Sequence, residues 1–248
     1  MEVGGWGGVS GAVMKPIPFF FAGLCLTAFV SAEELGQLVF EDSFERSESQ
    51  EKTDEPGNGW GTNSRSRAKG NKQVDLRDGA MYIYLSPEAD HAVSVTHAAE
   101  FTDGAVSLRF MLEGEKDVLG LEFADLGFKE VHAGHLFKVG VSTTKMDIDD
   151  MKSGSMNMAF YEAKKAKTLT KEQLALIASK KKVFPVKTAA GKWHDLVVQI
   201  TGDTVRVAID GKDVGSFASE GFAHPTKKML RLSVPHDAVV DDVKIWKK

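Results

Sequence analysis

Short segments in which apolar and polar residues alternate cover most of the chain and predict β-strands. They are rich in β-branched and aromatic residues and are bounded by turn residues, as half-buried strands are. The predicted strands span residues 80–85, 92–96, 105–112, 136–141, 196–201, 204–209, 212–217, 230–234 and 238–246. Gly202-Asp203 and Asp210-Gly211 are predicted hairpin turns. Many short strands without a longer sequence repeat predict a β-sandwich or barrel rather than a propeller or solenoid.

One segment, residues 168–181, has helical spacing instead. Thr170 and Gln173 stand at the two positions of a capping box, and Leu174 and Ile177 fall on one face. Lysines surround this helix: Lys164, Lys165, Lys167, Lys171, Lys180, Lys181 and Lys182. The lysines could form a polyanion site, or the segment could be a lid over a site. The alternative is a helix inserted between strands, which packs through its apolar stripe and keeps its lysines in water.

The first 32 residues differ in pattern from the rest of the chain. Lys15 precedes an apolar run from Pro16 to Val30, which ends in the small-x-small sequence Val30-Ser31-Ala32. This pattern predicts a cleaved secretory signal peptide, because about 15 apolar residues are too few for a bilayer that needs about 20. We therefore predict a signal peptide at residues 1–32, with Met14 as an alternative start. Residues 33–248 would form a single exported domain, periplasmic or extracellular, with no membrane span after cleavage.

Composition narrows the classes of function. The chain is 42% hydrophobic and 27% charged, with a net charge of -4, as expected of a folded globular protein. This charge argues against a nucleic-acid-binding protein that relies on bulk positive charge. The one cysteine, Cys25, lies in the predicted signal peptide, so the exported domain is predicted to lack both a disulfide and thiol chemistry.

Motifs near both ends of the predicted domain resemble those of a known fold family. They are Phe40-Glu-Asp-Ser-Phe-Glu-Arg46 with Gly57-Asn-Gly-Trp60, and Gly191-Lys-Trp-His194, Val207-Ala-Ile-Asp-Gly-Lys212 and Asp241-Asp-Val-Lys-Ile-Trp246. Together they resemble the concanavalin-A-like, or laminin-G-like, jelly roll, and most of all the bacterial 3-keto-disaccharide hydrolase (family-sixteen-glycosidase-like) domains. The resemblance implies an all-β jelly-roll sandwich with one inserted helix and a carbohydrate partner. It implies either a glycoside-processing hydrolase of the 3-keto-disaccharide type or a non-catalytic glycan-binding or cell-envelope interaction module.

The resemblance also implies a catalytic pattern against which the chain can be compared. Family-sixteen glycosidases carry Glu-x-Asp-x-x-Glu along one strand, which directs the carboxylates to one face where they flank the sugar bond. The nearest stretch here is Asp147-Ile-Asp-Asp-Met-Lys152, in which Asp147 and Lys152 stand at the positions of the two glutamates. We therefore do not expect that chemistry, and we expect Asp147, Asp149 and Asp150 to belong to a polar loop or sheet edge.

The histidines provide other candidates for chemistry. Glu130, His132 and His135 lie close together around a glycine, and His91 and His97 lie in polar segments. We predict Glu130, His132 and His135 as catalytic residues, because a histidine can act as general base beside a ketone. His91 and His97 are predicted to contact substrate, or to complete a Zn²⁺ site with the other three. The alternative is a hydrogen-bonded histidine pair that lines a loop.

The segment 57–72 combines Trp60 with Asn63, Arg65 and Arg67. Sugars stack on aromatic faces and exchange hydrogen bonds with amides and guanidinium groups, so these residues are predicted to bind substrate. Trp60 could equally be a core aromatic that closes the sandwich.

Three aspartates suggest a second kind of metal site. Pairing of the strand at Asp42 with the strand at Asp241 and Asp242 would bring carboxylates together, and such clusters can hold Ca²⁺. The alternative is that these acids solvate a sheet edge and form turns. A divalent metal, calcium or zinc, is the cofactor that the sequence suggests.

Overall fold

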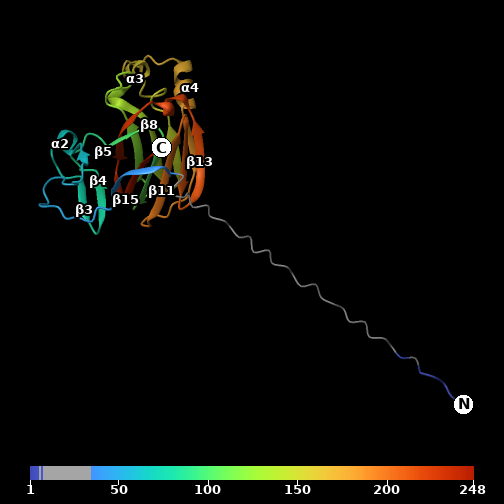
Figure 1. Ribbon diagram of the computed structural model, residues 1–248. Coiled ribbons are helices and arrows are strands. Elements are labelled where there is room, and N and C mark those ends of the chain that lie inside the picture. Colours follow the sequence, from blue (N-terminus) through green and yellow to red (C-terminus); the bar gives the residue numbers. More distant parts are fainter. Residues whose placement is uncertain (6, 8–34) are drawn as a thin grey trace.

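The computed structural model describes residues 1–5, 7 and 35–248 (Figure 1). Nearly all of the predicted signal peptide therefore lies outside the described residues. From Gln37 onward the chain forms two antiparallel sheets that pack face to face. In the described ranges, no helix has both the length and the apolar character needed to cross a membrane.

The larger sheet has eight strands. They are β1 (Gln37–Asp42), β3 (Val74–Arg77), β4 (Ala80–Tyr84), β6 (Gly104–Met111), β11 (His194–Thr201), β12 (Thr204–Ile209), β13 (Lys212–Ala218) and β15 (Asp237–Lys247). Their order is β13-β12-β11-β6-β15-β4-β3, and β1 pairs with β15.

The smaller sheet has seven strands. They are β2 (Gly61–Thr62), β5 (Val93–Phe101), β7 (Val118–Ala124), β8 (His135–Ser142), β9 (Lys145–Asp149), β10 (Lys181–Pro185) and β14 (Lys227–Val234). Their order is β10-β9-β8-β7-β14-β5-β2. Every predicted strand coincides with an observed one, including the strand at Asp42, which is β1. The strands β2, β3, β7, β9 and β10 were not predicted.

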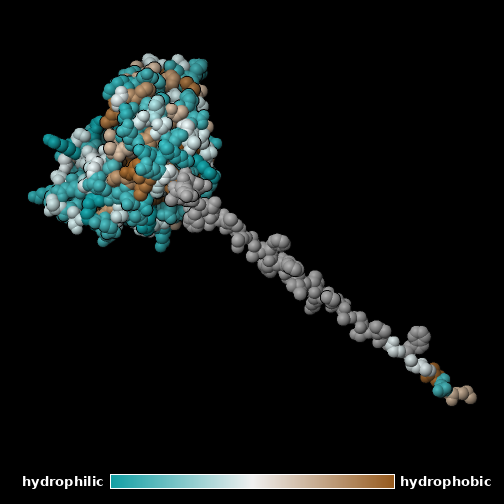
Figure 2. Space-filling model, viewed as in Figure 1, coloured by the Kyte–Doolittle hydropathy of each residue, from teal (hydrophilic) through white to brown (hydrophobic). Residues whose placement is uncertain are grey.

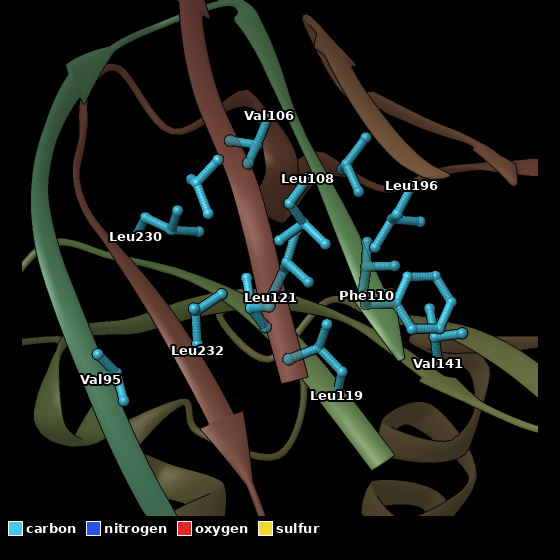
Figure 3. Close-up of a cluster of buried hydrophobic side chains, with 14 of the residues drawn as sticks. Val95, Val106, Leu108, Phe110, Leu119, Leu121, Val141, Leu196, Leu230 and Leu232 are labelled. Carbon is cyan, nitrogen blue, oxygen red and sulfur yellow. The ribbon is translucent and has the colours of Figure 1, made fainter. Parts of the chain in front are cut away.

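Alternate residues of the central strands fill the space between the sheets (Figure 3). Leu119 and Leu121 of β7 are fully buried, as is Phe110 of β6, and Leu108 is 2% exposed. Burial of a side chain of this size contributes about 1.5–3 kcal/mol to folding. The same cluster includes Val95, Val106, Val141, Leu196, Leu230 and Leu232, which are also labelled in Figure 3. The core therefore runs along the middle of both sheets.

Helices are few and lie outside the sandwich. α3 (Met158–Lys165) and α4 (Lys171–Ser179) form an insertion between β9 and β10 at one end of the sheets (Figure 1). α2 (Ser64–Arg67) and the 3-10 turns η1 (His132–Gly134) and η2 (Glu220–Ala223) are short. The capping box at Thr170 is confirmed, but the helix ends at Ser179 because Lys181 begins β10.

The expected packing of α4 through its apolar stripe is wrong. No residue of α4 is buried, and Leu174 and Leu176 are 52% and 43% exposed. Figure 2 shows hydrophobic residues over this end and a second group of them lower on the same face. The insertion contributes little to the core because the sheets bury their apolar residues without it.

Candidate functional site

Trp60 is a core residue and does not offer a surface on which a sugar could stack. Its side chain is in contact with Phe40 and Phe44, and only 7% of the residue is exposed. The indole Nε1 donates to Oδ2 of Asp42 at 2.9 Å, and Arg46 binds the other oxygen of that carboxylate at 2.7 Å. Burial acts to raise the pKa of Asp42, but these hydrogen bonds outweigh it and lower the pKa. Of the two interpretations of Trp60, the core aromatic is therefore correct.

The polar residues after Trp60 also have local roles. The amide of Asn63 donates to the carbonyl of Ala92 at 2.9 Å and accepts from the backbone of Ser94 at 3.0 Å, which fastens this segment to β5. Arg65 and Arg67 lie exposed on α2. The predicted substrate-binding residues therefore do not converge on one surface with Trp60.

His91 and His97 do not lie with the other candidate histidines. His91 is exposed, and its Nδ1 is 3.1 Å from the carbonyl of its neighbour Ala92. His97 stacks on Phe40 with ring centroids 3.7 Å apart and lies 5.0 Å from Trp60. His97 is thus part of the aromatic cluster around Trp60, and neither histidine completes a zinc site.

The predicted calcium ligands are brought near one another but are balanced by arginines. Asp42 is opposite Val243 in the pairing of β1 with β15, as the sequence suggested. Arg109 lies 3.2 Å from Asp241 and 3.7 Å from Asp242, however, and Asp42 is bound by Arg46. These arginines pair with the three carboxylates, which are therefore not free to bind a metal ion.

One other acidic group has the spacing of a metal site. Within the described part of the chain, only Glu48, Glu51 and Asp75 bring three potential ligand atoms within 4.8 Å of one another. The ammonium of Lys72 lies among them, at 2.7, 2.9 and 2.7 Å from the three carboxylates. A lysine therefore supplies the positive charge in this acidic group, and the ligand sets predicted from the histidines and from Asp42 are not assembled.

His135 lies in a charged cluster on the outer face of the seven-stranded sheet. Its Nδ1 is 2.9 Å from Oε2 of Glu122 on β7, and Arg231 on β14 is 3.2 Å from the same oxygen. Burial acts to raise the pKa of Glu122, but His135, Arg231 and Lys138 lower it to about 2. Glu122 is therefore an anion at physiological pH and holds His135 in a fixed orientation.

His132 lies beside this cluster, as its spacing from His135 suggested. Its ring is 6.3 Å from that of His135 and stacks on Tyr161 of α3 at 3.8 Å with the planes 8° apart. Burial, together with the positive charges of His135 and Lys165, lowers the pKa of His132, so its imidazole is neutral at pH 7. Glu130, by contrast, is exposed, and the carboxylate that pairs with a histidine here is Glu122.

The cluster belongs to a row of charges that crosses the outer face of the sheet. Residues directly opposite one another on neighbouring strands alternate in sign, and we call them the charge ladder: Arg231, Glu122, Lys138, Asp149 and Lys181. Opposite charges on adjacent strands stabilise a sheet by roughly 0.2–1 kcal/mol per pair.

Asp147 and Asp149 lie within this sheet, so their expected place in a polar loop or sheet edge is wrong, whereas Asp150 follows β9 outside the strand. Asp147 and Asp149 alternate with buried residues on β9, which has β8 and β10 on its two sides. Lys181 binds Asp147 at 2.8 Å and lies 3.9 Å from Asp149. Asp150 is fully buried and accepts a hydrogen bond from Ser219 at 2.5 Å, so it holds η2 against the end of β9.

Comparison with known proteins identifies the fold. No family model and no curated protein matches the sequence. The laminarinase from Rhodothermus marinus is similar in structure, with a TM-score of 0.56 and 12% identity over 85% of this chain and 97% of that one. SCLam, a non-specific endo-beta-1,3(4)-glucanase from family GH16, has a TM-score of 0.54 and 14% identity over 84% of this chain and 90% of that one. This chain is a concanavalin-A-like jelly roll.

A further structural neighbour is longer than this jelly roll. The endo-β-galactosidase from Clostridium perfringens that releases GlcNAcα1-4Gal has a TM-score of 0.58 and 9% identity, over 88% of this chain and 64% of that one. At these identities the likeness establishes the fold alone. The resemblance to 3-keto-disaccharide hydrolases stays a prediction.

The charge ladder and His132 bring together side chains whose pKa values are shifted in different directions. Glu122 is held as an anion, burial raises the pKa of Asp149, and His132 is held neutral. Glu122 and Asp149 lie two strands apart in one row, which places their Cα atoms roughly 10 Å apart. Groups with oppositely shifted pKa values on one surface are typical of acid–base chemistry. Glu122 was not predicted, because it is the one charged residue in the apolar strand β7.

Proposed function

We propose that this protein is an exported carbohydrate-interacting protein that acts as a glycoside-processing hydrolase of the 3-keto-disaccharide type. Its reacting groups would lie beside the charge ladder. The observation that carries this proposal is the pair formed by a neutral His132 and a His135 that Glu122 orients. The fold neighbours that act on glycans support carbohydrate as the substrate class.

The proposed reaction assigns one role to each side chain. Neutral His132 takes the proton from the carbon that lies between the ketone and the anomeric carbon. Arg231 stabilises the negative charge that develops on the ketone oxygen. The glycosidic C–O bond then breaks, its oxygen leaves with a proton from His135, and water adds across the remaining double bond. Glu122 is a positioning residue that holds His135. Glu130, which the sequence predicted as catalytic, is given no role in this reaction.

A non-catalytic glycan-binding module is the second candidate. The observation that favours it is the mutual pairing of the charge ladder, in which every charge is opposite one of the other sign. Such a fixed polar surface suits the recognition of hydroxyl groups without turnover.

Incubation of the purified protein with a panel of 3-keto-disaccharides separates the two candidates. We expect release of monosaccharide by the wild type, and loss of at least 100-fold in rate for His132→Ala and for His135→Ala. The matched control is His91→Ala, because His91 is exposed and away from the cluster. A chelator in a parallel reaction tests whether a metal takes part. Equal rates for His132→Ala and His91→Ala would refute the proposed roles.

A further inference from the structure

A cavity of about 500 Å³ lies on the outer face of the eight-stranded sheet, on the opposite side of the sandwich from the charge ladder. Small outward side chains of three neighbouring strands line it: Ser107 of β6, Val197 of β11 and Ala208 of β12. A second cavity of about 320 Å³ shares Asp242 and Lys244 with the first and extends to β1. We call the two cavities together the outer groove. It crosses β12, β11, β6, β15 and β1, and at about 4.8 Å per strand spans roughly 19 Å.

The groove has an aromatic residue at its rim. Trp193 precedes β11 and is 36% exposed, whereas Trp60 and Trp246 are 7% and 8% exposed. The guanidinium of Arg109, which lines the larger cavity, lies 4.8 Å from the centre of the Trp193 ring. This contact fixes the ring beside the groove and leaves part of it in water.

The polar groups that line the groove are held in place by further contacts. One oxygen of Asp210 is 2.7 Å from Nδ1 of His194, and the other accepts the backbone N–H of Asp195 at 2.9 Å. Asp242 lies where the pairing of β15 with β6 is interrupted by a bulge, and its φ is 49°. Bulges redirect side chains and are frequent next to binding sites. Groups that are fixed before binding lose little freedom when a ligand arrives.

We propose that the outer groove binds a neutral oligosaccharide, with a sugar ring stacked on Trp193. Hydroxyl groups both donate and accept hydrogen bonds, so they match a lining that has acceptors, Asp195, Asp210 and Asp242, and donors, Arg109 and Lys244. With Glu41 and Asp42 of the smaller cavity the lining carries five carboxylates against two cations, which disfavours a polyanion. The length of the groove suits a short chain of sugars better than a single one.

The inference rests on the proposed function in one respect, since it takes carbohydrate to be the ligand. It adds a second site, on the face opposite the proposed reacting groups. A glycan chain held in the outer groove would raise the local concentration of its neighbouring segments around the protein.

Laminarihexaose and cellohexaose are suitable probes, with an oligogalacturonate as the anionic comparison. Binding is measured by calorimetry and by tryptophan fluorescence, because Trp193 is the most exposed tryptophan within residues 35–248. We expect at least one neutral hexaose to bind, with at least tenfold weaker binding for Trp193→Ala and near wild-type binding for Trp193→Phe. Leu174→Ala is the matched control, because Leu174 is also exposed but lies on α4.

Equal affinity in Trp193→Ala and the wild type would overturn the inference, as would binding of the oligogalacturonate alone or no binding at all. Hydrolysis of 3-keto-disaccharides by the wild type without hexaose binding would refute the groove and leave the proposed reaction intact. Hexaose binding that depends on Trp193, without any hydrolysis, would support the groove and refute the hydrolase.

Discussion

Lys227 gives a sharp prediction about stability, because it is a fully buried lysine whose hydrogen bonds are to backbone carbonyl oxygens and not to a carboxylate. Its Nζ donates to the carbonyl oxygens of Thr102 at 2.5 Å and His224 at 3.2 Å. Burial, opposed by the charge of Asp103 and reinforced by that of Lys152, lowers the pKa of Lys227 from 10.5 to about 8. Charging this side chain therefore costs more in the folded protein than in the unfolded chain.

The sign and size of the effect follow from this difference in pKa. Between pH 8 and pH 10.5 the unfolded chain binds more protons at this residue than the folded protein does, so the free energy of unfolding rises with pH. The difference of 10.5 − 8 = 2.5 units, at 1.36 kcal/mol per unit, corresponds to about 3 kcal/mol.

Urea denaturation at half-unit steps from pH 7 to pH 10.5 measures this contribution. The comparison is with Lys227→Met, which keeps an apolar side chain of similar length but cannot titrate. We expect the difference in unfolding free energy, wild type minus variant, to rise by about 3 kcal/mol across this range. Taking the difference cancels the titration of other groups. A difference that stays constant with pH would refute the assigned pKa and the reasoning from burial.

Three further predictions concern other sites. Glu122→Gln should lower the unfolding free energy by about 3–5 kcal/mol at pH 7 in urea denaturation, because it leaves Arg231 without its buried anion; a change below 1 kcal/mol would contradict this. Lys72→Met should convert the surrounding acidic group into a calcium site, so that Ca²⁺ raises the melting temperature of the variant but not of the wild type. Gly221→Ala should destabilise the protein by several kcal/mol in the same assay, because a Cβ there would lie 1.8 Å from an oxygen of Asp150; a near-neutral result would show that η2 can shift.

The fold could be predicted from the sequence largely where one face of a strand meets water. β12 was predicted with its bounds, because its residues alternate between the core and the solvent. β7 was missed because nearly all of its residues are buried, which gives a continuous apolar run without alternation. β10 was missed because its lysines looked like the end of a helix, and its position depends on pairing with β9.

The candidate site was predicted less completely, for a physical reason. The proximity of His132 and His135 is local in sequence and could be predicted, whereas Glu122 and Arg231 meet them only through strand pairing. Trp60 has the composition of a sugar-binding segment around it, but its burial depends on Asp42, 18 positions earlier. Contacts between distant segments are not encoded in spacing along the chain.

The charge ladder also affects how accurately the sheet assembles. A strand displaced by one position would turn its charges into the apolar core, and one displaced by two would place several of them opposite residues that carry no charge. The neighbours of Glu122 at that spacing on β7 are Gly120 and Ala124, and Lys138 on β8 is followed by Gly140. Such misaligned sheets would leave charges without partners and be less stable than the native one. The ladder therefore selects against misaligned forms of this sheet, whatever ligand its outer face binds.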